Sequence, residues 1–273
     1  MSEATTVNWS TAASAFDRVA DSYDELFTRT AIGQAQRRQV WRRLLRVFEP
    51  GKRILELNCG TGEDARFLAL RGRSIVACDA SARMIAIAGA RTQHEAKRAD
   101  ITFRQIANED LGVLSRQKLF DGAYSNFSGL NCMADLQPVA RNLASLVRPG
   151  GRVLLCLWSR VCVAELVWYL IHGQASKAFR RFTGKASARI GEFHISVSYP
   201  TVGDVQGIFS PWFRLERRSA IGLFVPPSYV EGWVRERGRA LGHLEKMDRL
   251  FARLPVFRDV GDHVLLEFTR CRH

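Results

Sequence analysis

Two glycines and an aspartate have the spacing of a nucleotide-binding turn. Gly60-Thr61-Gly62 separates an apolar stretch, residues 53–57, from a segment of helical spacing that starts at Glu63. Glycines at such a turn let a ligand approach the backbone without a Cβ in the way, and the free N–H groups of a helix start attract electronegative atoms. Asp79 follows about 20 residues later, where a carboxylate can accept hydrogen bonds from both hydroxyls of a ribose.

Each of these features also has a purely structural interpretation. A tight glycine turn is common after any strand, and Asp79 stands where it could cap the helix that follows it. The glycine turn and Asp79 alone therefore leave a nucleotide site and an ordinary turn both open.

Strand-like and helical stretches alternate over the first 158 residues. Short apolar runs typical of buried strands occupy residues 53–57, 74–78, 101–106, 120–126 and 152–158. Helical spacing is found at residues 12–21, 33–48, 63–70, 82–96 and 136–147. This alternation predicts βαβ units and a mainly parallel sheet, whose strands end at one common crevice.

The pattern changes after Trp158. Helical spacing returns at residues 161–183 and 228–254, and strand-like stretches lie at residues 195–199, 213–218, 220–224 and 263–269. We therefore expect residues 1–159 to form a binding core. Residues 160–273 should add a mobile helical cap over the site and the far-edge strands of the sheet. At 273 residues, the two parts fit one compact unit.

Several segments resemble, in the right order, the motifs of the class I S-adenosylmethionine-dependent methyltransferases. Residues 54–62 are similar to the first motif of that family, and residues 79–84 match its D-x-S-x-x-M segment. Glu109-Asp110-Leu111 resembles its acidic turn, and residues 148–154 resemble its P-G-G turn into the fifth strand. Residues 15–24 resemble the N-terminal helix of the small-molecule branch. The resemblance implies a Rossmann-like doubly wound α/β fold, with a mainly parallel seven-stranded sheet, an antiparallel last strand and an inserted helical cap.

The same resemblance implies S-adenosylmethionine as the cofactor and S-adenosylhomocysteine as its product. Asp79 would bind the ribose hydroxyls, Gly60 and Gly62 would pass close to the methionine part, and Glu56 would help to hold the ammonium group. The other positions that the resemblance brings to the cofactor are Tyr23, Asn58, Ala80, Met84, Asn108, Glu109 and Asn126.

Three departures from the family pattern bear on recognition. Asn58 replaces the usual first glycine, so its side chain could crowd the cofactor or hydrogen-bond to it. Ala107 stands where an adenine-binding Asp is frequent, which leaves adenine recognition to backbone groups or Asn108. Residues 126–129, N-F-S-G, lack the Pro-Pro-aromatic run of enzymes that methylate adenine in DNA, which disfavours a nucleic-acid base as substrate.

The expected reaction is an S_N2 transfer of a methyl group to a small, apolar acceptor, lipid-like or a secondary metabolite, at a hydroxyl oxygen. The positions expected to face the acceptor are Phe127, Asn131, His194 and Tyr199. His263 leads the last strand, but no residue is compelled as a general base. An RNA methyltransferase, an NAD-dependent oxidoreductase and a noncatalytic cofactor-binding module remain as alternatives.

Charge and cysteine content bear on partners and location. The formal net charge is +13, but acidic residues are interleaved almost everywhere, so we expect no nucleic-acid partner. Contact with an anionic membrane is an open possibility for the basic residues of the cap, which are Lys177, Arg180, Arg181, Lys185 and Arg189.

None of the six cysteines forms a C-x-x-C pair, so no local metal site is expected. Without a secretory signal pattern, the chain is expected in the cytoplasm, and its oligomeric state is open.

Overall fold

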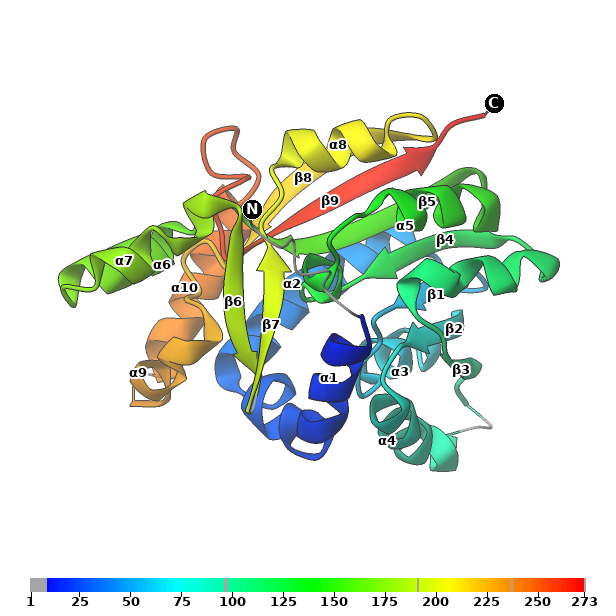
Figure 1. Cartoon of the computed structure of the whole chain (residues 1–273), viewed down its shortest axis with the longest axis horizontal. Helices are drawn as coiled ribbons and strands as arrows, with labels where there is room; N and C mark the ends of the chain where they lie inside the picture. The colour runs from blue at the N-terminus through cyan, green and yellow to red at the C-terminus, as the bar shows by residue number, and fades with distance from the viewer. Residues whose placement is uncertain (1–8, 96–97, 191, 237, 273) are drawn as a thin grey trace, which may run out of the picture.

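A seven-stranded sheet forms the centre of the protein (Figure 1). The computed structural model describes residues 9–95, 98–190, 192–236 and 238–272. The strand order is β3-β2-β1-β4-β5-β9-β8, and β9 runs antiparallel to both of its neighbours, β5 and β8. The strands are β1 Arg53–Leu57, β2 Ser74–Asp79, β3 Ile101–Gln105, β4 Phe120–Ser125, β5 Val147–Trp158, β8 Phe213–Ile221 and β9 His263–Arg270. The predicted mainly parallel sheet with an antiparallel last strand is confirmed.

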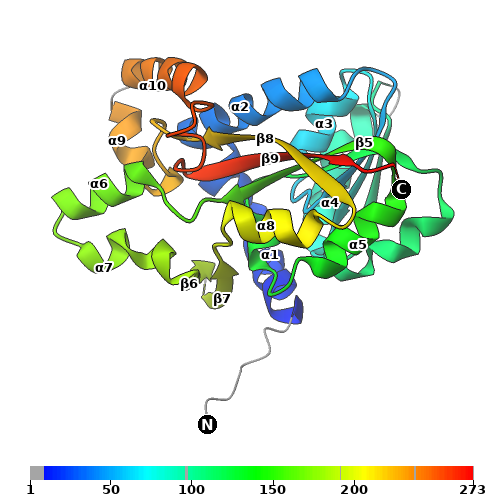
Figure 2. The ribbon, with the colours of Figure 1, turned by 90° about the horizontal axis from the view of Figure 1, so that it is seen from above.

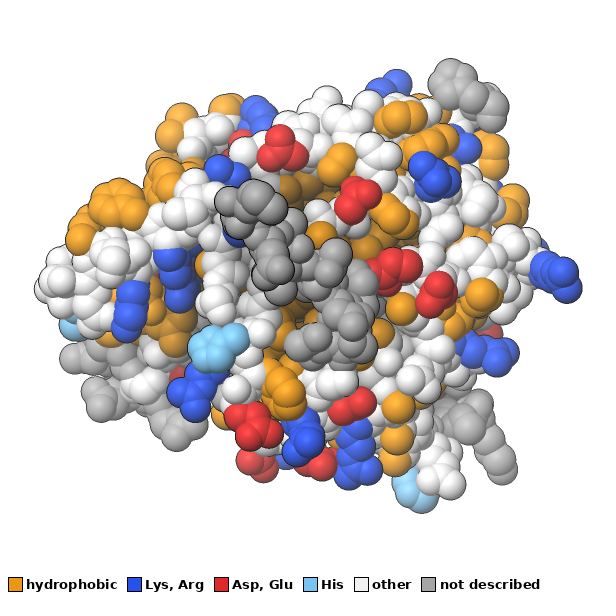
Figure 3. Space-filling view, viewed as in Figure 1, with side chains coloured by type: hydrophobic (Ala, Val, Ile, Leu, Met, Phe, Trp, Pro, Cys, Tyr) orange, Lys and Arg blue, Asp and Glu red, His pale blue; other side chains and the backbone are white. Residues whose placement is uncertain are grey.

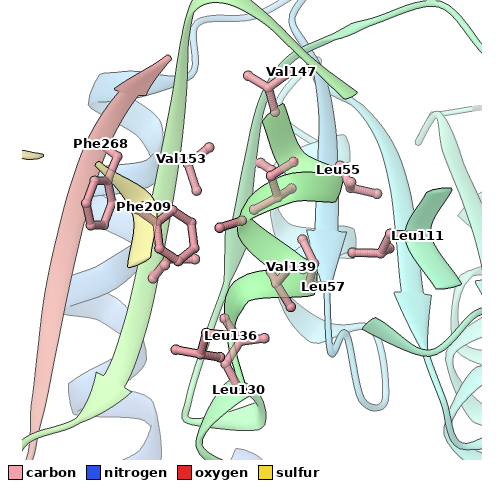
Figure 4. Close-up of a cluster of buried hydrophobic side chains, with 14 of the residues drawn as sticks. Leu55, Leu57, Leu111, Leu130, Leu136, Val139, Val147, Val153, Phe209 and Phe268 are labelled. Atoms are coloured by element: carbon pink, nitrogen blue, oxygen red, sulfur yellow. The ribbon is translucent and has the colours of Figure 1, made fainter. Parts of the chain in front are cut away.

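Helices cover both faces of this sheet, because alternate side chains of each buried strand point to opposite faces. Leu55 belongs to an apolar cluster shared with Val139 and Phe209, while its neighbour Ile54 belongs to a second cluster shared with Leu44. Figure 4 shows the first cluster between the strands and the helix that carries Val139. The helices of the core are α1 Trp9–Tyr23, α2 Ala31–Val47, α3 Glu63–Ala69, α4 Ala82–Thr92, α5 Gln137–Leu146 and α8 Val202–Phe209.

Short helical turns connect several of these elements. Helix α1 continues directly into a π-helical turn, Asp24–Thr28. The 3-10 turns are η2 Gln93–Glu95, η3 Asn108–Arg116, η4 Gly129–Cys132, η5 Arg180–Thr183 and η6 Ser228–Val230. Helices α9 Glu231–Glu236 and α10 Gly238–Phe251 precede β9.

The inserted cap is helical in part and contains a β-hairpin as well. Helices α6 Val163–Ile171 and α7 Ala175–Ala178 come first, followed by strands β6 Lys185–Ile190 and β7 Phe193–Ser198, which pair in an antiparallel ribbon. Ile195 and Val197 of β7 pack on Ala12 and Ala15 of α1, which explains the strand pattern of alternating burial. Figure 1 shows the hairpin standing beside α1, and Figure 2 shows α6 and α7 as an arm at the edge of the molecule.

None of the helices that the structure describes combines the length and the apolar composition needed to cross a bilayer.

Candidate active site

The turn after β1 and the end of β2 hold each other in place. Gly60 has φ +53°, and its backbone N–H donates to Asp79 Oδ2 at 2.9 Å. The N–H of Ser81 donates to Asp79 Oδ1, also at 2.9 Å. Burial raises the pKa of Asp79, although these two hydrogen bonds oppose the change. The cap of α4 is the Ser81 hydroxyl, which accepts from Met84 N–H, so Asp79 is a fixed acceptor at the end of β2 and not the helix cap.

A cavity of about 700 Å³ opens above this turn. It lies within the size range of ligand sites, roughly 300–1,000 Å³. Among the residues predicted to meet the cofactor, the cavity lining contains Tyr23, Asn58, Gly60, Asp79, Ala80, Met84, Asn108 and Asn126. The tertiary structure therefore brings positions from α1, β1, β2, α4, η3 and β4 to one end of one cavity.

Gly62 lies outside the cavity lining and serves packing. Its φ is +77°, and a Cβ built on it would lie 2.8 Å from the Cβ of Ala88 and 3.0 Å from the ring of Phe103. This glycine lets the turn pack closely against α4 and β3. Whether Gly62 also passes close to the cofactor stays a prediction.

Two of the three acidic residues predicted at the cofactor site, Glu56 and Glu109, also lie outside the lining. Glu56 is buried beneath the turn, and its Oε2 atom has no hydrogen-bond partner among the described residues. Burial and the nearby charge of Asp64 raise the pKa of Glu56 well above its usual value. Burial likewise raises the pKa of Glu109. Their roles toward a cofactor stay predictions.

Asn58 does not project its side chain across the cavity. Its side-chain amide oxygen, Oδ1, accepts a hydrogen bond from Ser125 Oγ at 3.1 Å, and the side chain packs on the backbone of Gly129. A Cβ on Gly129 would lie 2.4 Å from the Cβ of Asn58, so the glycine makes room for the asparagine. Gly129, in the segment after β4, thus provides the space that Asn58 needs at the position of the usual glycine.

A buried ion pair that the sequence did not reveal supports the end of β4. Arg37 and Asp64 form a pair with 2.6 Å between Nη1 and Oδ1, and both are buried. Asp64 also accepts from Asn126 Nδ2 at 2.9 Å, which leaves Asn126 Oδ1 without a partner among the described residues. Burial would lower the pKa of Arg37, but Asp64 outweighs burial and raises it. Arg37 is one of several arginines in α2, and its spacing along the chain does not distinguish it from the others.

Tyr23 closes the cavity from the end of α1. Burial raises the pKa of Tyr23 to about 12, although the charge of Arg37 opposes the change. Its hydroxyl therefore stays protonated at neutral pH and can donate a hydrogen bond.

Apolar and aromatic side chains line the other end of the cavity. Phe127, with φ +47°, lies two residues beyond β4 and belongs to this lining. The remaining apolar lining comes from α1, the turn that follows it, β5, the hairpin and η6: Ala12, Phe16, Val19, Phe27, Trp158, Ile190, Ile195, Tyr199 and Tyr229. The polar lining near them includes Ser128, Arg181, Asp262 and His263.

Only two of the four residues predicted to face an acceptor, Phe127 and Tyr199, line the cavity. Asn131 is buried elsewhere: its Nδ2 donates to the Ser198 carbonyl at 2.7 Å, and its Oδ1 accepts from Trp158 N–H at 3.0 Å. His194 is exposed on the outer face of the hairpin, because its neighbour Ile195 takes the buried face. Asn131 thus joins β7 to β5 and His194 faces away from the cavity, so a contact of either residue with the acceptor stays a prediction that this arrangement does not support.

His263 is the polar residue whose position sequence reasoning left undecided. It is 3% exposed and its ring lies edge-on to Phe127, with 5.6 Å between ring centroids. Only the pairing of β9 with β5, which sets His263 opposite Trp158, brings it to the cavity.

Comparison with known proteins agrees with this arrangement. Residues 54–151 match the family model of a methyltransferase domain. A demethylmenaquinone methyltransferase from Mycobacterium tuberculosis (strain ATCC 25618 / H37Rv) is 33% identical over 150 residues, which are 54% of this chain and 58% of that protein. The Thermobifida fusca enzyme of the same name is 29% identical over 157 residues, covering 56% and 64%. The chain thus spans somewhat more than half the length of these relatives.

Solved structures extend the similarity to nearly the whole chain, at the level of fold alone. The N-methyltransferase NodS from Bradyrhizobium japonicum WM9 has a TM-score of 0.57 at 16% identity, covering 96% of this chain and 100% of that chain. An S-adenosylmethionine-dependent methyltransferase from Mesorhizobium loti has a TM-score of 0.54 at 17% identity, covering 88% and 100%. Residues 54–151 thus match a methyltransferase domain, and the chain has the fold of solved S-adenosylmethionine-dependent methyltransferases.

Proposed function

We propose that this protein transfers a methyl group from S-adenosylmethionine to a hydroxyl oxygen of a small, apolar acceptor. The observation that carries the proposal is the single cavity that joins Gly60 and Asp79 at one end to the aromatic lining around Phe127 at the other. A cofactor site and an acceptor site in one cavity are what a direct transfer between two bound molecules requires.

The residues at the first end fit the cofactor. The left-handed backbone at Gly60 leaves space for a close approach, and Asp79 is fixed with lone pairs to spare on both oxygens. The buried Oδ1 of Asn126 has no partner among the described residues and suits an ammonium donor. When bound, S-adenosylmethionine supplies a methyl group already activated on a sulfonium.

The protein's own task is therefore positioning and exclusion of water. Asp79 would hold the ribose through its two oxygens, and the protonated Tyr23 hydroxyl would donate to the carboxylate of the methionine part. Helix α1 and the hairpin cover the cavity from the side opposite the sheet, which shields the transfer from solvent.

The acceptor end favours an apolar molecule with an aromatic or otherwise flat body. Its lining is mostly aromatic and aliphatic, with Ser128 and His263 as polar groups close to Phe127. The name of the curated relatives states a quinone-type acceptor, demethylmenaquinone, which supports the lipid-like class.

An RNA methyltransferase is the second candidate, and the distribution of the basic residues weighs against it. Many arginines form ion pairs with carboxylates of the protein itself. Examples are Arg37 with Asp64, Arg66 with Glu95 and Arg181 with Glu165. Figure 3 shows basic side chains scattered among acidic ones over the face that it displays. An NAD-dependent oxidoreductase is disfavoured by the methyltransferase-domain match.

The arm of α6 and α7 supports contact with an anionic membrane surface. Val163, Val167, Leu170 and Ile171 of α6 are between 42% and 71% exposed, and they recur at helical spacing. Lys177 and Lys185, which follow the helix, are exposed as well. An exposed apolar stripe flanked by lysines suits the interface of anionic lipids. Two of the five basic residues expected to face a membrane do not fit, because Arg181 is buried and Arg180 is held by Glu165.

Two measurements test the proposed function. Calorimetry should show binding of S-adenosylhomocysteine and no binding of NAD. Radiolabelled S-adenosylmethionine should pass its label to an organic-extractable phenol such as 2-naphthol and not to RNA. Binding of NAD alone, or labelling of RNA alone, would replace the proposal with the corresponding alternative.

A further inference from the structure

A histidine stands at the junction between the two ends of the cavity. His263 opens β9 opposite Trp158 of β5, and its ring meets the ring of Phe127 at an interplanar angle of 89°. Phe127 directly follows Asn126, whose free Oδ1 belongs to the cofactor end. The imidazole therefore lies beside the place that the reacting part of an acceptor must occupy if the methyl group is to reach it.

A fixed carboxylate lies beside the ring. Nδ1 of His263 is buried and lies 3.4 Å from Oδ2 of Asp262, its nearest carboxylate, but makes no hydrogen bond to the described residues. That carboxylate accepts from Gln36 Nε2 at 3.0 Å and from Arg181 Nη2 at 2.8 Å. With Nδ1 turned to the carboxylate, Nε2 is the nitrogen left to face the cavity with its lone pair.

Arg181 is fixed in turn, so the carboxylate cannot swing away. Its guanidinium donates to Glu165 Oε2 at 2.7 Å and to the backbone carbonyl of Asp262 at 2.8 Å. Cys162, Glu165 and Asp262 lie close enough together to suggest a metal site, but the two carboxylates of that group already hold Arg181.

The charged groups around the imidazole of His263 favour its use as a proton acceptor. Burial lowers the pKa of His263, although Asp262 opposes the change and Arg181 adds to it. The ring is therefore neutral near pH 7. The other charged group near the Phe127 side is Arg37, which packs on the ring of Phe127 at 4.7 Å. Asp262 can stabilise the imidazolium that forms when the ring takes up a proton.

We propose that His263 is the general base of this protein and that Asp262 is its positioning residue; this inference rests on the proposed function. The O–H bond of the acceptor breaks and its proton bonds to Nε2 of His263. The electron pair of the oxygen forms the new bond to the methyl carbon, while the pair of the broken carbon–sulfur bond stays on sulfur. The proton then passes from the imidazolium to solvent.

The test compares methyl transfer to 2-naphthol, an apolar aromatic molecule with one hydroxyl, in three proteins across a range of pH. These are the wild type, His263→Gln and the control His194→Gln, which changes an exposed histidine outside the cavity. We expect His263→Gln to lower kcat by about 10²-fold or more, the usual size of general-base catalysis. The KM for this acceptor and the affinity for S-adenosylhomocysteine should stay close to those of the wild type.

The pH profile separates a base from a structural residue. The loss in His263→Gln should shrink at high pH, where 2-naphthol ionises in solution and needs no base. Asp262→Asn removes the charge that favours the imidazolium, so the acid limb of the profile should move to lower pH. An unchanged kcat in His263→Gln, or a loss of the same size at every pH, overturns the inference.

Chemical labelling gives a readout that does not depend on turnover. Diethyl pyrocarbonate reacts with neutral imidazole, and mass spectrometry can locate the label. His263 should react in the wild type, with a midpoint below the ordinary histidine pKa of about 6.5, and 2-naphthol should protect it. If the wild type binds S-adenosylhomocysteine but methylates no hydroxyl compound, the proposed function fails. If His263 stays unlabelled while His194 is labelled, the inference about the base fails.

Discussion

Asp79 fixes the turn after β1 and is predicted to bind the cofactor, and its substitution can separate these two roles. Its oxygens accept from the N–H groups of Gly60 and Ser81, so Asp79→Ala would unpair both groups.

Asp79→Asn keeps one acceptor and removes the charge. We expect this variant to bind S-adenosylhomocysteine more weakly by about 1.5–3 kcal/mol, the value of hydrogen bonds to a charged group. Calorimetry on the folded variant measures the change, with Asp100→Asn, an exposed acid away from the cavity, as the control. Equal affinity in wild type and Asp79→Asn would remove Asp79 from the cofactor site.

Glu56 provides a pH-dependent test at the same scale. Its pKa in the folded protein is raised well above the unfolded value by burial. Its ionised form is therefore disfavoured in the fold, and stability decreases as the pH rises through the unfolded value of about 4.3 towards the folded one. Glu56→Gln should stabilise the protein without ligand at pH 7, by about 1–3 kcal/mol, the cost of a buried unpaired polar group. It should have little effect at pH 4.

Urea unfolding at the two pH values measures this difference. A variant that is less stable than the wild type at pH 7 would mean that Glu56 has a stabilising partner. The affinity of Glu56→Gln for S-adenosylhomocysteine tests the predicted contact with the ammonium group independently, because that contact predicts weaker binding.

At the scale of elements, the turn after β1 depends on close packing as well as on backbone conformation. Gly62→Ala places a Cβ 2.8 Å from Ala88 and 3.0 Å from the ring of Phe103, at a φ of +77°. We expect a loss of about 1–3 kcal/mol in the free energy of unfolding, as for other overpacked sites. Gly89→Ala in α4 is the matched control, since a Cβ there meets nothing within 4 Å. The control should be neutral or stabilising by up to about 1 kcal/mol, because alanine is the better helix former. Similar unfolding curves for both variants would contradict the packing role.

The exposed stripe of α6 predicts binding to lipid. Wild type should sediment with vesicles that contain phosphatidylserine, and less so at high salt, because lysines and apolar residues act together. Val167→Asp should lose most of this binding. Val113→Asp is the matched control, because Val113 is a similarly exposed valine on η3, at 66% against 54% for Val167. Wild type that stays in the supernatant at low salt, or equal losses in both variants, would contradict a membrane contact through α6.

At the scale of the whole molecule, the basic residues are dispersed, and many arginines pair with carboxylates of the fold, while the net charge stays at +13. Arg43, for example, pairs with the buried Glu267, and Arg91 with Glu63. Such pairs hold elements together and do not create a field for a polyanion.

This distribution predicts weak binding to nucleic acid, with an affinity that changes little with salt concentration. A protein held by six or more phosphate contacts loses about 10³-fold or more in affinity between about 50 and 200 mM salt. Fluorescence anisotropy with a single-stranded RNA should show no submicromolar binding at physiological salt. Tight binding with a steep salt slope would favour the RNA methyltransferase instead.

The sequence by itself determined the parallel core and the end of the sheet at which ligands bind. Gly60 follows β1 and Asp79 ends β2, and neighbouring parallel strands end at the same edge, so the two residues had to meet. The same local spacing brought Asn58, Ala80, Met84 and Asn126 to the cavity.

Only the tertiary structure decided which side chains face that cavity from the rest of the chain. The hairpin turns His194 outward because Ile195 packs on α1, and Asn131 is used to join two strands. Arg37 is buried because Asp64, from another helix, neutralises it, and His263 reaches the site only through the pairing of β9 with β5. Spacing along a chain predicts where an element ends, whereas the face that a side chain presents depends on partners distant in sequence.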